Sequence, residues 1–117
     1  MPYLKDDGGG ITERSLKFWN ENKSKIGKVT HVEVSEEGLQ TEDRKSESGI
    51  TYPVEYNTMI TGTQGSILLS GCNCGYGGEG PNGTAKILAE LGLHIDKARK
   101  AMYQKTIHYD TLTCEVK

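Results

Sequence analysis

One segment of the sequence concentrates residue types that could bind a phosphate or a nucleotide. Six of the thirteen residues from 71 to 83 are glycines. Glycine destabilises regular structure, so such a dense run indicates unusual backbone conformations or a close contact with another group. An apolar strand is predicted before the run and a helix after it. In that arrangement the free amides and the dipole of the helix N-terminus can bind an anion.

The side chains within and after the glycine run indicate how such a ligand would be held. Tyr76 could stack on a base or ring, while Glu79 could accept hydrogen bonds from hydroxyls, since a carboxylate repels phosphate. Thr84 and Lys86 supply a hydroxyl and an ammonium near the predicted helix start. The predicted ligand-binding residues are Gly75, Tyr76, Gly77, Gly78, Glu79, Gly80, Asn82, Gly83, Thr84 and Lys86. A tight connection that packs strand against helix is the alternative explanation of the glycines.

Two phosphate-binding patterns match the glycine run only formally. The pattern G-x-G-x-x-G begins at Gly75 and again at Gly78, but the βαβ unit and the later acidic residue of a dinucleotide fold are missing. The pattern G-x-x-x-x-G from Gly78 is followed by Thr84, where a Walker loop requires lysine. The chain is therefore assigned to neither family.

Two closely spaced cysteines give a weaker indication of chemistry. Cys72 and Cys74 could be metal ligands, but structural zinc sites usually show a second closely spaced pair, which here would have to be assembled from His108 and Cys114, six residues apart. Cys72 at a strand end could also be a nucleophile facing a helix N-terminus, where a thiolate is favoured. A hydrolase that uses Cys72 or zinc is therefore one hypothesis.

The histidines do not single out a catalytic base. His31 shares a predicted strand face with Glu33, and His108 shares one with Asp110, but such pairs arise easily by chance. A nucleophile also needs a base within reach, and no spacing in the sequence selects one. We therefore predict no catalytic residue, no metal ligand and no cofactor, and we favour a binding protein over an enzyme.

The elements that must position the glycine run predict a small α+β fold. Apolar residues recur every three to four positions in some segments, as in helices, and at every second position in others, as in strands. These patterns predict an antiparallel sheet of about four to five strands, one N-terminal helix and two helices after the run. The predicted elements are helices over 12–25, 83–91 and 94–104, strands over 29–35 and 50–56, a hairpin over 56–70 and a last strand from Thr106. Thr12 is the expected N-cap of the first helix. The alternation of the last strand slips near residue 110, which indicates a bulge.

Two further segments are predicted to lack regular structure. Residues 1–10 end in three glycines and are expected to form a flexible arm, which leaves 11–117 as a single α+β domain. Residues 40–48 are wholly polar and predict an exposed loop. Pro53 cannot donate to a ladder, so its strand is expected at a sheet edge.

Composition excludes several classes of protein. The chain has 117 residues, a net charge of −2 and a pI of about 5.9, which argues against a dedicated nucleic-acid binder. Its longest apolar run is far shorter than a membrane span, and its N-terminus lacks a secretory signal pattern. An odd number of cysteines fits a reducing compartment, so we expect a cytoplasmic protein. Few large apolar residues predict a thin core, which oligomerisation would supplement.

Two functions follow as predictions. The first is a non-catalytic protein that captures or sequesters a small phosphorylated or nucleotide-like ligand, for example a signalling nucleotide, through loop 71–84. The second is a protein-interaction module, such as an inhibitor or immunity-type protein, that uses the acidic stretch 33–47. That stretch holds six acidic residues against two basic ones. In either case we expect a homo-oligomer without a membrane partner.

Overall fold

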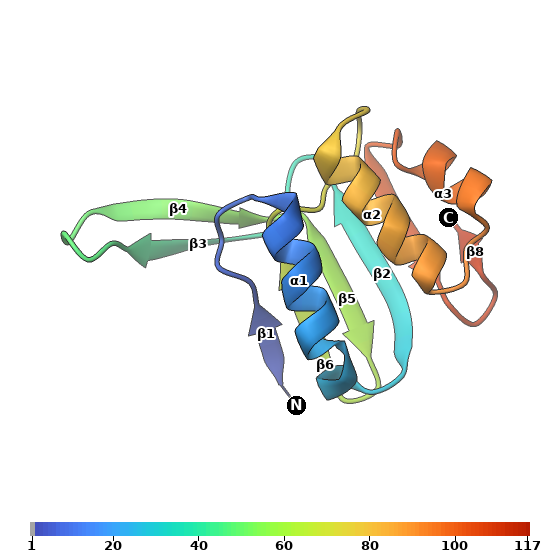
Figure 1. The fold of residues 1–117 in the computed structure, drawn as a ribbon, viewed down its shortest axis with the longest axis horizontal. Helices are drawn as coiled ribbons and strands as arrows, with labels where there is room; N and C mark the ends of the chain where they lie inside the picture. Colours follow the sequence, from blue (N-terminus) through green and yellow to red (C-terminus); the bar gives the residue numbers. More distant parts are fainter. Residues whose placement is uncertain (1) are drawn as a thin grey trace.

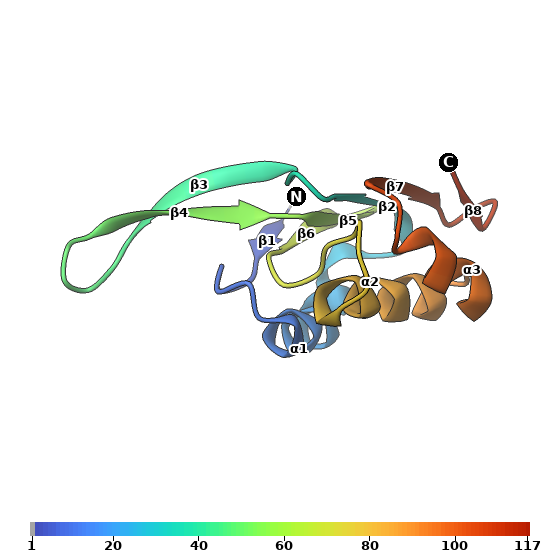
Figure 2. The ribbon, with the colours of Figure 1, turned by 90° about the horizontal axis from the view of Figure 1, so that it is seen from above.

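A six-stranded sheet with helices on one face forms the body of the protein (Figures 1 and 2). The computed structural model describes residues 2–117. Its elements are β1 (Tyr3–Lys5), α1 (Thr12–Asn22), the 3-10 helix η1 (Lys23–Ile26), β2 (Val29–Ser35), β3 (Gln40–Lys45), β4 (Thr51–Tyr56), β5 (Thr58–Gly62), β6 (Gly65–Leu69), α2 (Glu79–Glu90), α3 (Ile95–Ala101), β7 (Thr106–Asp110) and β8 (Glu115–Val116). The sheet order is β1-β6-β5-β2-β7-β8, with β1 parallel to β6 and the other neighbours antiparallel.

The core lies between the helices and one face of the sheet. Alternate residues of the central strands point toward the helices, as strand geometry requires. Fully buried members of this face are Val34, Ile60, Ile67, Leu69 and Ile107. Trp19 and Leu88 bring α1 and α2 into the same apolar cluster. Among residues 2–117, no helix covers the opposite face of the sheet (Figure 2).

The strands β3 and β4 form a separate two-stranded sheet that projects from the body as an arm (Figure 1). One face of the arm is apolar near its root, where Val54 and Tyr56 are buried against Leu68. Farther out on β4, Tyr52 is 40% exposed and Ile50, near the tip, is 66% exposed. The arm is therefore anchored at one end by packing and open to solvent at the other.

The α+β class and several elements confirm the sequence predictions. The strand over 29–35, the hairpin within 56–70 and the two helices after the glycine run are all present. Helix α2 ends as predicted, because Gly92 has φ 105° and Leu93 N–H donates to Leu88 O at 3.0 Å. Pro53 lies in a strand with one free edge, as its missing N–H requires.

The predicted number of strands is wrong. The structure has a mixed sheet of six strands and a second sheet of two, among residues 2–117, rather than one antiparallel sheet of about four to five strands. Two segments expected to be irregular are strands. Residues 3–5 pair with β6, although 1–10 was expected to be a flexible arm, and residues 40–45 pair with β4, although 40–48 was expected to be a loop. Neither segment alternates clearly, because β1 has three residues and β3 is solvated.

Three element boundaries also differ from the predictions. The N-cap of α1 is Ile11, and the Thr12 hydroxyl donates instead to Gly71 O at 2.7 Å. Helix α2 begins at Glu79, four residues before the predicted start at 83. The expected bulge near residue 110 is a turn between β7 and β8, where Cys114 has φ 55°. Within the described chain no helix is long and apolar enough to cross a membrane.

Candidate functional site

A groove of about 480 Å³ lies between the first turns of α1 and α2. Both helices begin at the same end of the molecule and run side by side (Figure 1). Gly83 allows their close contact, because a Cβ atom there would lie 2.6 Å from Thr12 Cγ2. Farther along the pair, Trp19 Nε1 donates to Glu90 Oε2 at 2.8 Å. The two helices are thus held together by close packing beside the groove and by a hydrogen bond farther along the pair.

Side chains at helical spacing form the two walls of the groove. It is lined by Ile11, Thr12, Glu13 and Leu16 on the α1 side and by Glu79, Asn82, Gly83 and Lys86 on the α2 side. The α2 set repeats every three to four residues and so lies along one face of that helix. These four α2 residues belong to the ligand-binding set predicted from the sequence.

The groove combines both signs of charge with free helix amides. Lys86 supplies an ammonium, and Glu13 and Glu79 supply carboxylates; all three residues are exposed. Neither helix has a side-chain cap, since the N-cap residues Ile11 and Gly78 accept no such hydrogen bond. The first amides of each helix therefore carry partial positive charge that side chains do not satisfy. This combination suits a ligand that has an anionic group together with hydroxyl or amino groups.

Three of the predicted site residues serve the packing of the glycine run. Gly75 has φ 100°, and its N–H donates to Met102 O at 2.8 Å. Gly80 is buried, and a Cβ atom there would lie 2.1 Å from Asn73 Oδ1. The Thr84 hydroxyl is buried and donates to Asn73 O at 2.7 Å. The hydroxyl of Thr84 thus already has a partner inside the protein, and neither Gly75 nor Gly80 lines the groove.

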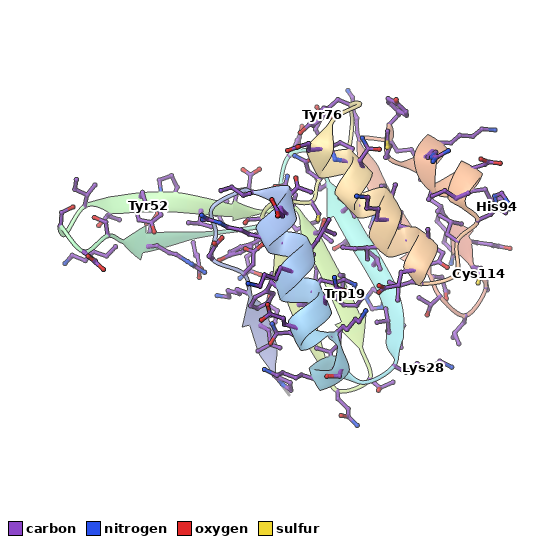
Figure 3. The ribbon with its side chains drawn as sticks, viewed as in Figure 1. Trp19, Lys28, Tyr52, Tyr76, His94 and Cys114 are labelled. Atoms are coloured by element: carbon purple, nitrogen blue, oxygen red, sulfur yellow. The ribbon has the colours of Figure 1, made fainter. Side chains whose placement is uncertain are left out.

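The tip of the glycine loop lies at the same end of the molecule as the groove without lining it. Tyr76 is 47% exposed at this end (Figure 3), and its hydroxyl accepts from Asn73 Nδ2 at 3.1 Å. Its ring covers Gly78, where a Cβ atom would lie 2.8 Å from Tyr76 Cε2. Gly77 faces the hydroxyl of Tyr103. Close packing against the Tyr76 ring therefore accounts for Gly78, whereas the Tyr103 side chain that faces Gly77 is exposed and can move.

The buried thiols do not have the properties of activated nucleophiles. Cys72 and Cys74 are both buried and free. Burial raises the pKa of Cys72 to about 12 and that of Cys74 to about 11. Both are therefore protonated thiols at neutral pH, whereas the nucleophilic form of cysteine is the thiolate. Over residues 2–117, no three His, Cys, Asp or Glu side chains are close enough together to hold a metal ion.

The acidic stretch 33–47 includes one carboxylate with a structural role. Glu42 accepts from Lys5 Nζ at 2.7 Å, from the Tyr56 hydroxyl at 2.8 Å and from Arg44 Nε at 2.9 Å. These hydrogen bonds lower the pKa of Glu42 to about 2, and the one from Lys5 has the largest effect. Glu42 thus ties the arm to β1 and is already paired, so the stretch is not a uniform acidic surface.

The α1 side of the groove was missed by the sequence predictions. Apolar periodicity placed Thr12 and Leu16 in the first helix, but nothing in the sequence relates them to a helix about seventy residues later. Their proximity to Lys86 arises only because α1 and α2 pack side by side on one face of the sheet. The fold and the groove define a small α+β protein with a solvent-open groove between two helix N-termini. Comparisons with protein families, curated proteins and solved structures gave no match to this chain.

Proposed function

We propose that the chain is a non-catalytic binding protein that captures a small phosphorylated or nucleotide-like ligand in the groove between α1 and α2. The supporting observation is the meeting of two uncapped helix N-termini at a groove that contains Lys86. Helix N-termini and lysine are recurrent phosphate-binding groups. A groove of about 480 Å³ also falls within the size range of small-molecule sites.

The lining indicates how the parts of such a ligand would be distributed. A phosphate would lie by the helix amides and Lys86, because these are the positive groups of the groove. Hydroxyl or amino groups would donate to Glu13 or Glu79. An apolar ring would contact Ile11 and Leu16. Tyr76 would contact the ligand only after turning away from Gly78, so we give it no part in the proposed binding mode.

Capture without conversion fits the chemical groups of this lining. The groove contains carboxylates, an amide and an ammonium, and the thiols of the glycine run are buried and protonated. Sequestration requires only affinity, which these groups supply without an activated nucleophile.

The decisive experiment is thermal unfolding of the chain with nucleotides, cyclic nucleotides and sugar phosphates. Binding at one hundred times the Kd stabilises a protein by about 2.7 kcal/mol, a shift of several degrees for a domain of this size. Lys86→Met should abolish the shift, whereas Lys45→Met on the exposed arm makes the same charge change as a control. Mass analysis of the recovered ligand then separates capture from conversion. A shift that survives in Lys86→Met, or no shift with any compound, would contradict the proposal.

A second candidate function is protein interaction through the β3–β4 arm. The arm projects from the body and exposes Tyr52 (Figure 3), and Ile50, two residues before it in the sequence, is also exposed. Exposed apolar side chains that continue a buried cluster are typical of association surfaces. The same surface would serve the homo-oligomer that the thin core favours.

Light scattering of the wild type and of Tyr52→Ser distinguishes these roles of the arm. A dimer that dissociates in Tyr52→Ser, with an unchanged unfolding midpoint per chain, supports the arm as an oligomer contact. If the wild-type chain is monomeric at all concentrations, the arm is not a contact between copies of this chain, and its partner would be a different protein. Capture of the same partner by wild type and Tyr52→Ser would exclude the apolar arm face from that interaction.

A further inference from the structure

The segment from residue 97 to residue 105 contains four basic residues and no acidic one. The bases are Lys97, Arg99, Lys100 and Lys105, and all four are exposed. Within residues 2–117 none of them forms an ion pair, whereas bases of β1, α1 and the arm do. This part of the surface is therefore locally positive, although the whole chain has a net charge of −2.

Helical spacing places an aromatic ring on the same face of α3 as two of these bases. Ala98 and Ala101 are buried, so their side of the helix faces the core. Arg99, Lys100 and Tyr103 lie on the outward side, because residues three and four apart share a helix face. The helical turn continues beyond α3 to Tyr103, whose N–H donates to Lys100 O at 3.3 Å. The Tyr103 side chain is 60% exposed.

The glycine loop brings a second exposed tyrosine to this surface. The loop is bonded to the end of α3, since Gly75 N–H donates to Met102 O at 2.8 Å. Tyr76 follows in the loop and is 47% exposed (Figure 3). A Cβ atom on the next residue, Gly77, would lie 3.1 Å from the hydroxyl oxygen of Tyr103. The two tyrosines therefore adjoin, and we refer to them and the four bases as the basic patch: Tyr76, Lys97, Arg99, Lys100, Tyr103 and Lys105.

Helix stability explains only part of the basic patch. Arg99 and Lys100 lie in the last turn of α3, where positive charge stabilises the negative end of the helix dipole. Lys97 lies closer to the start of the helix, and Lys105 lies beyond its end. The dipole gives no reason for two exposed tyrosines beside these bases. The composition of the patch therefore indicates contact with a partner that has both negative charge and flat apolar groups.

We propose that the basic patch binds single-stranded nucleic acid, at a surface that shares no residue with the groove between α1 and α2. Lysine and arginine would neutralise phosphates, and unpaired bases would stack on Tyr76 and Tyr103. Binding would be independent of sequence, because every base has an aromatic face. An acidic peptide would engage the bases of the patch alone and leave both rings without a role. The pI of about 5.9 confines this activity to one surface of the chain.

The proposal is tested by fluorescence anisotropy of a labelled oligothymidylate of about twenty nucleotides, titrated with the full chain at low salt. The expected result is saturable binding that weakens as salt rises, because phosphate contacts release counterions. Lys100→Ala should weaken binding and reduce the slope of log affinity against log salt by about 0.7, the value for one phosphate contact on a single strand. The matched control is Lys28→Ala, which makes the same charge change at the opposite end of the molecule from Tyr76 (Figure 3).

Substitution of the rings separates stacking from charge alone. Tyr103→Ala should weaken binding by about fivefold or more, whereas Tyr103→Phe, which keeps the ring, should bind like the wild type. Tyr52→Ala, on the arm, is the matched control. Circular dichroism confirms that each variant is folded. Absence of saturable binding, equal weakening in Lys28→Ala, or unchanged affinity in Tyr103→Ala would each overturn the proposal. Polyglutamate that competes as well as the oligonucleotide would also overturn it and would assign the patch to an acidic protein partner.

Discussion

Replacement of Asp6 should strongly destabilise the protein, although Asp6 lies in a segment that the sequence predicts to be flexible. Its side chain is 3% exposed. Its carboxylate accepts from Ser70 Oγ at 2.8 Å, Ser70 N at 2.9 Å and Gly8 N at 3.0 Å, and also from the Ser15 hydroxyl. One carboxylate thus joins the N-terminal segment to α1 and to the end of β6.

The magnitude follows from the donors that Asp6→Ala would leave without an acceptor. A hydrogen bond to a charged group contributes about 1.5–3 kcal/mol, and a buried donor left unpaired costs about 1–3 kcal/mol. The Ser70 amide cannot reorient, whereas the two serine hydroxyls can rotate toward other acceptors. We therefore expect Asp6→Ala to lower the free energy of unfolding by about 3–5 kcal/mol, as is typical when one partner of a buried charged network is removed.

Urea unfolding followed by circular dichroism measures this loss. With a denaturant slope of about 2 kcal/mol per molar urea, the midpoint should fall by about 2 M. Asp7→Ala is the matched control, since Asp7 is exposed and its ion pair with Arg14 is 3.4 Å long on the surface. That variant should lose less than about 1 kcal/mol. Equal losses in the two variants would refute the structural role of Asp6.

Three other predictions concern the arm root, the thiols and the glycine run. The depressed pKa of Glu42, about 2 against an ordinary 4.5, contributes stability that is present above pH 4.5 and lost as pH falls toward 2. Acid titrations should therefore show a smaller loss over that window in Glu42→Gln than in wild type, and equal losses would contradict this. Alkylation of the native chain, followed by mass spectrometry, should label Cys114 alone, with the two buried thiols reacting only after unfolding. Gly80→Ala should cost about 1–3 kcal/mol through overpacking, whereas Gly77→Ala, at an exposed position, should be tolerated in the same urea assay. Tolerance of Gly80→Ala would remove the packing explanation of that glycine.

Elements with a clear apolar period could be predicted from sequence. Alternation from residue 29 to 35 and the signals at Gly92 and Leu93 are local features, and each appears in the structure as predicted. β3 could not be found in this way, because it lies in a projecting two-stranded sheet where none of its residues is fully buried, so its sequence needs no apolar period. β1 could not be predicted either, because three residues are too few to show an alternating apolar pattern.

Only the α2 side of the candidate site could be predicted from the sequence. The spacing of Glu79, Asn82 and Lys86 is helical, so their common face on α2 follows from local geometry once the helix start is known. Gly80 and Gly83 looked like ligand contacts from composition alone. Only the packed structure shows that Gly80 accommodates Asn73 and that Gly83 accommodates Thr12.

The sequence by itself determined the class of fold, the order of the main elements and the concentration of glycines before α2, because these depend on residue type and local period. Tertiary structure decided which distant residues meet. The pairing of β2 with β7 places His31 beside Asp110, and the packing of α1 on α2 places Leu16 beside Lys86 in one groove. Both depend on strand register and helix packing, which are set by the whole core and leave no pattern in the residues they bring together.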